Sequence, residues 1–428
     1  MVGSLFRKLF HDYITAKDNL NKAIEIGESL PKNNQKYQNH LAMAYNNLAQ
    51  LQRNVFKDFK SANENYNKEL VIWENMPKTH PENLNLLALT YCNLADFQQQ
   101  DLSDYKSAKD NYSKAIEILE NLPKNNPEFC ENLASAFNGL AMLHRDHLKD
   151  NKLAKEYFCK AIDIREQLPN NNPKFLNNLA STYNRLAILQ ADFSDDFESS
   201  KDTFNQAIEI WKQLPKDNTK YQSNLMSAYI NYALLQTKYK DGLTLVQDNF
   251  IKAIQIGEQL PHNNPEYQFL LSKGYFNLAI FQSKHTKDYK TVNNNYNRAI
   301  EIREKLPKEN PDYRHSLAST YNSYAYFCKD CFNNIEDAKD NCNKAIEIEK
   351  ELSLNNPEKY IIEWINCKHS LAEIYFNNNE IETAKSILNE IKPFAEKCLS
   401  AKPNDKRIIF VVGDIDKLMK NIKQKEQE

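Results

Sequence analysis

Three cysteines near the carboxyl end have the spacing in this chain that is closest to a metal site. Cys328 and Cys331 form a Cys-x-x-Cys pair, and Cys342 follows eleven residues later. A structural zinc ion needs four Cys or His ligands, usually supplied as two close pairs. The second pair is missing here, and positions equivalent to Cys342 carry aromatic residues elsewhere in the chain. We therefore expect ordinary core thiols and no metal, with a zinc site as the remote alternative.

The segment His144-Arg145-Asp146-His147 is the other candidate for chemistry. It lacks the Glu between two His four residues apart that a metalloprotease helix needs, and His144 takes a packing position that is Gln in other repeats. Seven glycines in the whole chain leave little room for a phosphate-binding loop. We find no catalytic constellation and expect no cofactor. An enzyme remains only as an alternative that depends on the Cys328/Cys331 cluster.

Composition narrows the class of protein further. The chain has 428 residues, of which 41% are hydrophobic and 26% charged, as is typical of a folded domain. The formal net charge of −2 gives no electrostatic reason to expect nucleic acid as a partner. No apolar run approaches the roughly 18 residues of a membrane span, and the start shows no secretory signal. Eight cysteines inside helical patterns indicate reduced thiols and a cytoplasmic location.

A repeat of 46 residues organises the chain. Six Leu-Pro pairs and one Met-Pro pair recur at this spacing without slippage, and their prolines are Pro31, Pro77, Pro123, Pro169, Pro215, Pro261 and Pro307. At the eighth expected position stands Ser353. A fixed period of this length predicts a solenoid, in which each unit stacks on its neighbours.

One period, residues 126 to 173, predicts two antiparallel helices. Asn126 is a suitable N-cap and Pro127 a suitable first helical residue, while Asp150 can cap the second helix. The apolar face of the first helix carries Leu133, Phe137, Leu140 and Ala141. Leu168-Pro169 ends the second helix, because the residue before proline avoids helical geometry. Neither helix can bury its apolar face alone, so neighbouring pairs must stack.

The spacing of small and aromatic residues resembles the tetratricopeptide repeat. The second helices read Ala-x3-aromatic-x2-Ala, as in Ala108, Tyr112 and Ala115, and an earlier first helix contains Tyr91-x2-Leu94-Ala95. The NNLA segment at residues 46–49 and the AIEIRE segment at residues 299–304 are similar to the long-period repeats of kinesin light chains and nephrocystin-like proteins. The resemblance covers nearly the whole chain. It implies an all-α, right-handed α-solenoid of about eight helical hairpins, although the period exceeds the usual length of about 34 residues.

The two ends differ from the repeats, as the ends of a solenoid must. We predict an N-terminal capping helix within residues 1–34, a repeat array over residues 35–402, and a C-terminal capping helix with a polar tail over residues 403–428. The most irregular internal repeat begins at Asp241-Gly242-Leu243, where the usual helix start is lost. We expect residues 238–250 to open first and to split the array into two cooperative blocks.

The resemblance also implies that the first helix of each pair lines a concave groove. One position of this helix reads Asn47, Asn93, Gly139, Arg185, Asn231, Asn277 and Ser323 in consecutive repeats. Asn at this position would hydrogen-bond to the backbone of a bound peptide, since a carboxamide both donates and accepts hydrogen bonds. The alternative is that these amides cap or bridge within the solenoid.

An apolar position lies about one turn further along the same face of these helices. It reads Met142, Ile188, Leu234, Ile280 and Tyr326 in five consecutive repeats. This series forms either an apolar groove floor or part of the core between repeats. Arg185 and Lys273 would add two cations to the groove and favour a ligand with an acidic residue flanked by apolar or aromatic ones. The alternative is that Arg185 is a solvated surface residue paired with a nearby Asp.

The function that the sequence favours is a non-catalytic scaffold that holds a peptide or helix of another protein in its groove. The alternative is a regulatory or sensor subunit whose superhelix changes shape when it binds a signal peptide. Solenoids contact only their nearest neighbours and flex easily, which would allow such a change.

Overall fold

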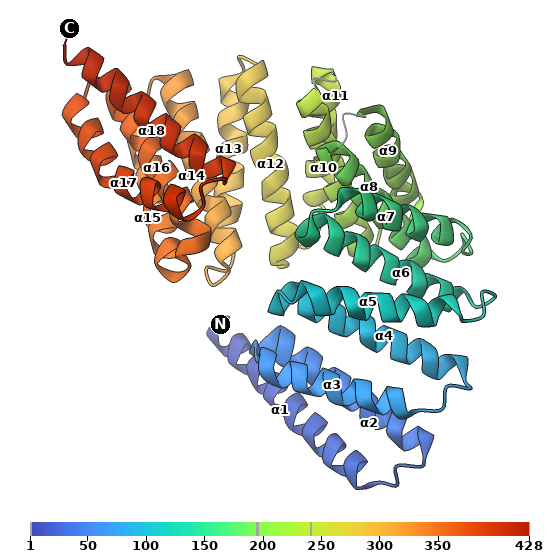
Figure 1. Cartoon of the computed structure of the whole chain (residues 1–428). Helices are drawn as coiled ribbons and strands as arrows, with labels where there is room; N and C mark the ends of the chain where they lie inside the picture. The colour runs from blue at the N-terminus through green and yellow to red at the C-terminus, as the bar shows by residue number, and fades with distance from the viewer. Residues whose placement is uncertain (1, 194–196, 240–241, 428) are drawn as a thin grey trace. The chain divides into compact units, whose positions relative to one another are not determined.

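The computed structural model describes the backbone of residues 2–193, 197–239 and 242–427, and the side chains of these ranges from Asp12 onward. All regular elements in the described ranges are helical (Figure 1). The α-helices are α1 (Val2–Ser29), α2 (Gln35–Leu51), α3 (Phe59–Asn75), α4 (Pro81–Phe97), α5 (Tyr105–Glu120), α6 (Pro127–Leu143), α7 (Asn151–Glu166), α8 (Pro173–Phe193), α9 (Phe197–Gln213), α10 (Thr219–Tyr239), α11 (Leu243–Gly257), α12 (Pro265–His285), α13 (Tyr289–Glu304), α14 (Pro311–Phe332), α15 (Ile335–Asn355), α16 (Pro357–Asn377), α17 (Ile381–Ala401) and α18 (Lys406–Lys425).

These helices form eight pairs, from α2/α3 to α16/α17, with α1 before them and α18 after them. The prediction of an all-α solenoid of about eight hairpins is confirmed. We call the even-numbered member of each pair the first helix and the odd-numbered member the second helix. Backbone contacts divide the chain into two units, residues 1–215 and residues 216–428. Each unit is described by itself.

Side chains at the predicted caps begin the helices. Asn126 accepts a hydrogen bond from the backbone N–H of Glu128, and Pro127 is the first residue of α6. Asp150 accepts from the N–H of Leu153 and starts α7. Each cap satisfies a donor that the first helical turn leaves unpaired. Both cap predictions are therefore confirmed.

The first helices of the first three pairs end in a π-helical turn, over Gln52–Phe56, Gln98–Leu102 and His144–Leu148. A residue in the left-handed region follows each turn, at Lys57, Ser103 and Lys149. The next residue is Asp, whose side chain caps the second helix. The wide turn lengthens the first helix while keeping the connection short.

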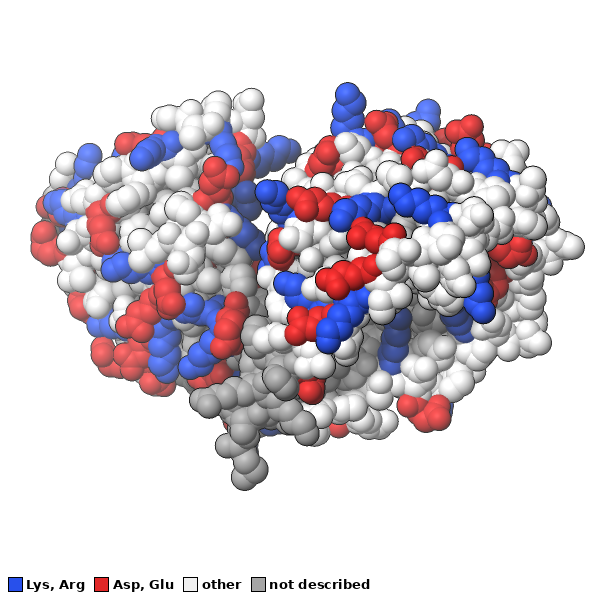
Figure 2. Space-filling model, turned by 90° about the horizontal axis from the view of Figure 1, so that it is seen from below, with Lys and Arg blue, Asp and Glu red and all other residues white. Residues whose placement is uncertain are grey.

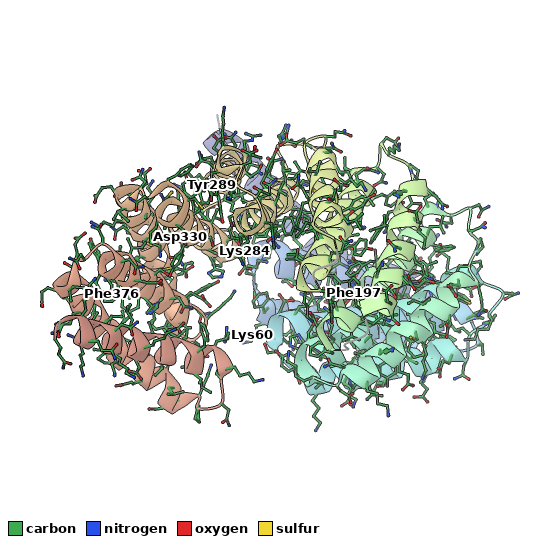
Figure 3. The ribbon with its side chains drawn as sticks, turned by 90° about the horizontal axis from the view of Figure 1, so that it is seen from above. Lys60, Phe197, Lys284, Tyr289, Asp330 and Phe376 are labelled. Atoms are coloured by element: carbon green, nitrogen blue, oxygen red, sulfur yellow. The ribbon has the colours of Figure 1, made fainter. Side chains whose placement is uncertain are left out.

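A small residue, usually alanine, makes close packing possible inside most of the pairs. Ala62, Ala108, Ala154 and Ala338 are all fully buried, as is Ser200, whose hydroxyl donates to the carbonyl of Ala187 at 2.8 Å. Four residues later the rings of Tyr66, Tyr112, Phe158 and Phe204 lie in the core. Tyr289, at the start of α13 and labelled in Figure 3, packs against Phe327 and Phe332 near the end of α14.

Buried amides also join the two helices of a pair. Asn65 donates to Gln52 at 2.7 Å, and the same bond recurs at 2.8 Å between Asn111 and Gln98, Asn249 and Gln236, and Asn295 and Gln282. In the third pair His144 and Tyr157 replace the two amides, with ring centroids 5.6 Å apart. These polar bonds set the register of the two helices, because a shift would leave buried groups unpaired.

Tyrosines on the first helices join neighbouring pairs. Tyr91 donates to Glu74 of the preceding second helix at 2.6 Å, and Tyr275 donates to Glu258 at 2.7 Å. Tyr45, Tyr183 and Tyr321 make the equivalent bonds to Glu28, Glu166 and Glu304. The repeated joint therefore orients each first helix against the helix before it.

At the carboxyl end, α18 covers the last pair. Its buried face contains Ile408, Val411, Ile415, Leu418 and Ile422. On the face of the molecule drawn in Figure 2, Lys and Arg side chains are interspersed with Asp and Glu side chains. None of the helices in the described ranges is both long enough and apolar enough to cross a membrane.

Candidate functional site on the first helices

The candidate site is the face formed by the first helices of each unit. The stronger contacts between helices two apart in the chain all involve first helices: α4 meets α6, α10 meets α12, α12 meets α14, and α14 meets α16. First helices that follow one another therefore contact each other directly within a unit. We call their solvent-facing surface the first-helix face.

Four asparagines of the predicted ladder have free side chains. Asn47 is exposed, and Asn93, Asn231 and Asn277 are partly exposed. None of these four amides hydrogen-bonds to another described residue, and none is fully enclosed. The neighbouring Asn46, by contrast, donates to Glu69 at 2.8 Å. The ladder positions thus offer donors and acceptors that the fold itself does not use.

The apolar series beside the asparagines is neither fully buried nor fully exposed. Leu234 has 43% of its surface exposed, and Met142, Ile188, Ile280 and Tyr326 are partly exposed. Ile280 also packs on the core around Ala279 and Tyr296, and the Tyr326 hydroxyl donates to Glu373 at 2.9 Å. These side chains combine a packing role with an apolar surface beside the amides.

Arg185 and Lys273 belong to different units, the first and the second respectively. Arg185 is partly exposed and donates to Asn138 at 3.3 Å, but no carboxylate in the described ranges pairs with it within 4.0 Å. Burial, followed by the nearby Arg165 and Arg145, lowers its pKa. Lys273 is exposed, and its Nζ lies 4.4 Å from the centroid of the Phe269 ring.

Buried ionic groups beneath this face were not among the site residues predicted from the sequence. Arg165 and Glu131 form a fully buried ion pair, with Nη2 and Oε1 2.7 Å apart. Arg303, at the equivalent position in a later repeat, is also buried. One signal could have revealed them: a single second-helix position reads Trp73, Leu119, Arg165, Trp211, Gly257, Arg303 and Glu349. Charged residues at an otherwise apolar position indicate a special environment.

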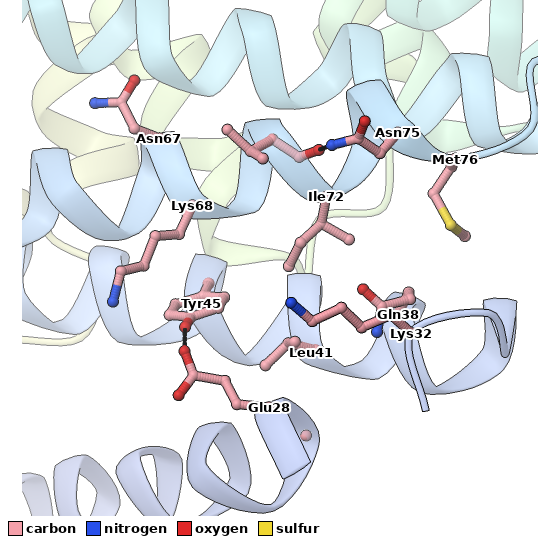
Figure 4. A pocket seen from close by; sticks show the side chains of 12 residues that line it. Glu28, Lys32, Gln38, Leu41, Tyr45, Asn67, Lys68, Ile72, Asn75 and Met76 are labelled. Carbon is pink, nitrogen blue, oxygen red and sulfur yellow. Dashed lines mark hydrogen bonds between the residues drawn. The ribbon is translucent and has the colours of Figure 1, made fainter. Parts of the chain in front are cut away.

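Two hollows lie beside these helices. In the first unit, a hollow of about 680 Å³ between α1, α2 and α3 has Leu41, Ile72 and Met76 in its lining, next to the Tyr45–Glu28 hydrogen bond (Figure 4). In the second unit, one of about 750 Å³ between α14, α16 and α18 is lined in part by His315 and Glu349. His315 Nδ1 lies 2.7 Å from Glu349 Oε1, and this hydrogen bond raises the pKa of His315.

The cysteines and histidines do not assemble into a site in the described ranges. Cys328 and Cys342 are buried and Cys331 is partly buried, and all three are free thiols. Burial raises the pKa of Cys328 to about 11 and that of Cys342 to about 12, which leaves both thiols protonated at neutral pH. His144 is 2% exposed. No group of three His, Cys, Asp or Glu with metal-binding geometry occurs in those ranges.

The model of the tetratricopeptide repeat family matches residues 134–168, which span most of α6 and all of α7. No curated protein matches the chain.

Three solved structures illustrate what the fold is similar to. BtubC (BKLC) from P. vanneervenii is 21% identical, with a TM-score of 0.48, over 57% of this chain and 90% of its own. The apo form of RapI is 12% identical, with a TM-score of 0.49, over 73% and 98%. Aspartyl phosphate phosphatase F from Bacillus subtilis is 14% identical, with a TM-score of 0.45, over 85% and 90%. The family model thus matches one helical pair, and helical pairs recur along the described parts of the chain.

Proposed function

We propose that this chain is a non-catalytic scaffold whose first-helix face binds a segment of another protein. The observation that supports the proposal most directly is the set of unbonded carboxamides at Asn47, Asn93, Asn231 and Asn277, beside partly exposed apolar side chains. A carboxamide can donate to a peptide C=O and accept from a peptide N–H. The adjacent apolar residues would then contact the side chains of the bound segment.

The experiment is a screen of a short-peptide library against the full chain, followed by affinity measurements on the peptides selected. The double variant Asn231→Ala with Asn277→Ala is expected to weaken binding roughly tenfold or more, since each amide supplies hydrogen bonds worth about 0.5–1.5 kcal/mol. The matched control is Asn294→Ala with Asn343→Ala, which removes two exposed amides from the second helices α13 and α15. Equal affinity of both double variants would refute the proposal.

The alternative function is a regulatory subunit that changes shape on binding a signal peptide. Its support is the contact pattern, because the substantial contacts join helices that are adjacent or next to adjacent in the chain. Small changes at each joint could therefore add up along the array. Small-angle scattering curves that are identical with and without a selected peptide would exclude this alternative and leave the simple scaffold.

A further inference from the structure

Arg303 on α13 is a buried cation without a carboxylate partner. The residue is 4% exposed. Its Nε donates to the Ser272 hydroxyl at 3.0 Å, and its Nη1 donates to the carbonyl of Ser316 at 2.7 Å and to the Thr320 hydroxyl. Its Nη2 has no hydrogen-bond partner in the described part of the chain. Burial lowers the pKa of Arg303 to about 9, so the group remains charged at neutral pH.

Arg165 occupies the same position three periods earlier, and its guanidinium has both hydrogen-bond partners and a carboxylate. Its Nη1 donates to the carbonyl of Asn178 and to the Thr182 hydroxyl, the equivalents of Ser316 and Thr320. Glu131 then accepts from Nε at 3.1 Å and from Nη2 at 2.7 Å. Ser135 accepts from Nη2 at 2.9 Å. Arg165 thus has a bidentate carboxylate partner, the geometry that Arg favours.

The two residues that complete the Arg165 site are replaced at Arg303. Phe269 stands at the position of Glu131, and Lys273 stands at the position of Ser135. A neutral Glu–Arg pair therefore becomes two positive charges. The position of Ser135 and Lys273 is exposed in both repeats. The other position changes from the buried Glu131 to the partly exposed Phe269.

Aromatic rings compensate part of the charge. The Cζ of Arg303 lies 4.8 Å from the centroid of the Phe276 ring and 6.0 Å from that of Phe269. The Nζ of Lys273 lies 4.4 Å from the centroid of Phe269. A ring face attracts a cation, but more weakly than a carboxylate does at this depth. Two cations share one ring here, and no carboxylate in the described ranges lies within 4.0 Å of either. Asp312, which pairs with Lys359, acts on Lys273 only from a longer distance.

We propose that Arg303 and Lys273 together receive the carboxylate of an acidic side chain in the segment that the chain binds. This inference rests on the proposed function, because it assigns one subsite of the first-helix face. The carboxylate would accept from Arg303 Nη2, as Glu131 does from Arg165, and from Lys273 Nζ. The apolar surface at Phe269 and Phe276 would contact the carbon atoms of the same side chain.

The test uses the full chain with ¹⁵N-labelled arginine and follows the Nε–H resonance of Arg303, assigned by its loss in Arg303→Lys. The probes are N-acetyl-glutamate N-methylamide, its glutamine counterpart and inorganic phosphate. We expect saturable shifts with the glutamate probe and binding of the glutamine probe that is roughly tenfold or more weaker. Lys273→Gln, a surface substitution, should weaken binding of the glutamate probe.

A matched pair of variants separates charge from shape. Phe269→Glu supplies the internal carboxylate that Glu131 gives to Arg165, so the resonance should stop responding to the glutamate probe. Phe269→Gln has a side chain of similar size without charge, so the response should persist. If Phe269→Glu does not fold, the comparison of Lys273→Gln with the unmodified chain still decides the question.

Three results would overturn the inference. The first is the absence of a saturable shift at Arg303. The second is a shift that the exposed Arg298 matches in size and midpoint, which would indicate a general ionic effect. The third is tighter binding of phosphate than of the carboxylate probe.

The peptide screen with Asn231→Ala and Asn277→Ala is independent of this measurement. Peptide binding that depends on these two asparagines, without any Arg303 response, would remove the inference and leave the proposed function intact.

Discussion

At the scale of single residues, Arg165 and Arg303 are the same side chain at the same repeat position in opposite electrostatic situations. Arg165 forms a buried ion pair with Glu131, whereas Arg303 forms hydrogen bonds and contacts aromatic rings but has no counterion. Removing one member of a buried pair leaves the other charge unpaired, which costs about 3–5 kcal/mol. Removing a buried charge that has no charged partner leaves no unpaired charge behind.

We therefore predict that Arg165→Met strongly destabilises α6 to α8, while Arg303→Met leaves the stability of α12 to α14 unchanged or raises it by about 1–4 kcal/mol, the range for apolar replacement of buried charges. Native-state hydrogen exchange of the backbone amides in these helices measures both effects. Equal losses of protection in the two variants would contradict the comparison. The double variant Arg165→Met with Glu131→Leu should recover most of the lost protection.

Glu69 provides a test that depends on pH. Its carboxyl is 5% exposed and accepts from Asn46 at 2.8 Å and Thr90 at 2.9 Å, with no cation paired to it in the described ranges. Burial raises its pKa above the ordinary value of 4.5. The folded state then binds the proton more tightly than the unfolded state does. The cost of ionising Glu69 is absent below about pH 4.5 and grows as the pH rises through the raised pKa.

We predict that Glu69→Gln gains stability relative to the unmodified chain as the pH is raised from 4 to 7. Urea unfolding midpoints at the two pH values measure this gain. The exposed Glu117 provides the control, because Glu117→Gln should show a much smaller dependence on pH. A midpoint difference for Glu69→Gln that does not change between these pH values would show that the carboxyl ionises freely in the folded state.

At the scale of elements, α11 starts without a side-chain cap hydrogen bond, a feature that it shares with α17 among the second helices whose starts the structure describes. Its N-cap is Gly242, which has a φ of 55° and no side chain to accept a hydrogen bond. Asp150 supplies that bond at the equivalent end of α7. A Gly cap in place of Asp costs only about a few tenths of a kcal/mol. Val246 is buried at the usual alanine position, and its branched side chain has restricted rotamers in a helix.

We predict that residues 242–250 exchange their backbone amide hydrogens before the rest of the array, and that opening there separates two cooperative blocks. The sequence prediction covered residues 238–250, of which 240 and 241 lie outside the described residues. Residues 151–162, which begin with a complete cap, serve as the internal reference. Exchange that is as slow at residues 242–250 as at residues 151–162 would show the prediction to be wrong.

At the scale of the whole molecule, stability is a sum over pairs and the joints between them, since each pair contacts only its neighbours. The last joint depends on α18, which packs against α16 and α17. Its five buried apolar residues cover the end of the array. Their burial contributes about 1.5–3 kcal/mol for each large side chain before the entropy of ordering is subtracted.

Removal of residues 404–428 should therefore lower the exchange protection of α16 and α17 while leaving that of α12 and α13 unchanged. Mass-spectrometric hydrogen exchange on the shortened chain can resolve the two regions. A uniform loss of protection along residues 216–401 would indicate cooperative folding over several pairs. It would also contradict the nearest-neighbour description.

Local physical rules were enough to predict the fold from the sequence. The Leu-Pro pairs end the second helices because proline excludes helical geometry from the preceding residue, and Asn126 and Asp150 cap where predicted because their side chains satisfy N–H groups of the first turn. The 46-residue period requires stacking, since one pair cannot bury its own apolar face. These rules act within a few residues or at a fixed spacing, so they can be read directly from the chain.

Tertiary structure alone decided which polar groups find partners. Glu131 and Arg165 are 34 residues apart, yet they form a bidentate pair because α6 and α7 pack at one register. The same packing puts Phe269 beside Arg303 and leaves that guanidinium without a carboxylate. It also leaves Asn231 and Asn277 unbonded, while Asn249 and Asn295 are bonded in the core. Residue type does not distinguish these asparagines, because their bonding depends on which side chains the neighbouring helices bring within about 3 Å.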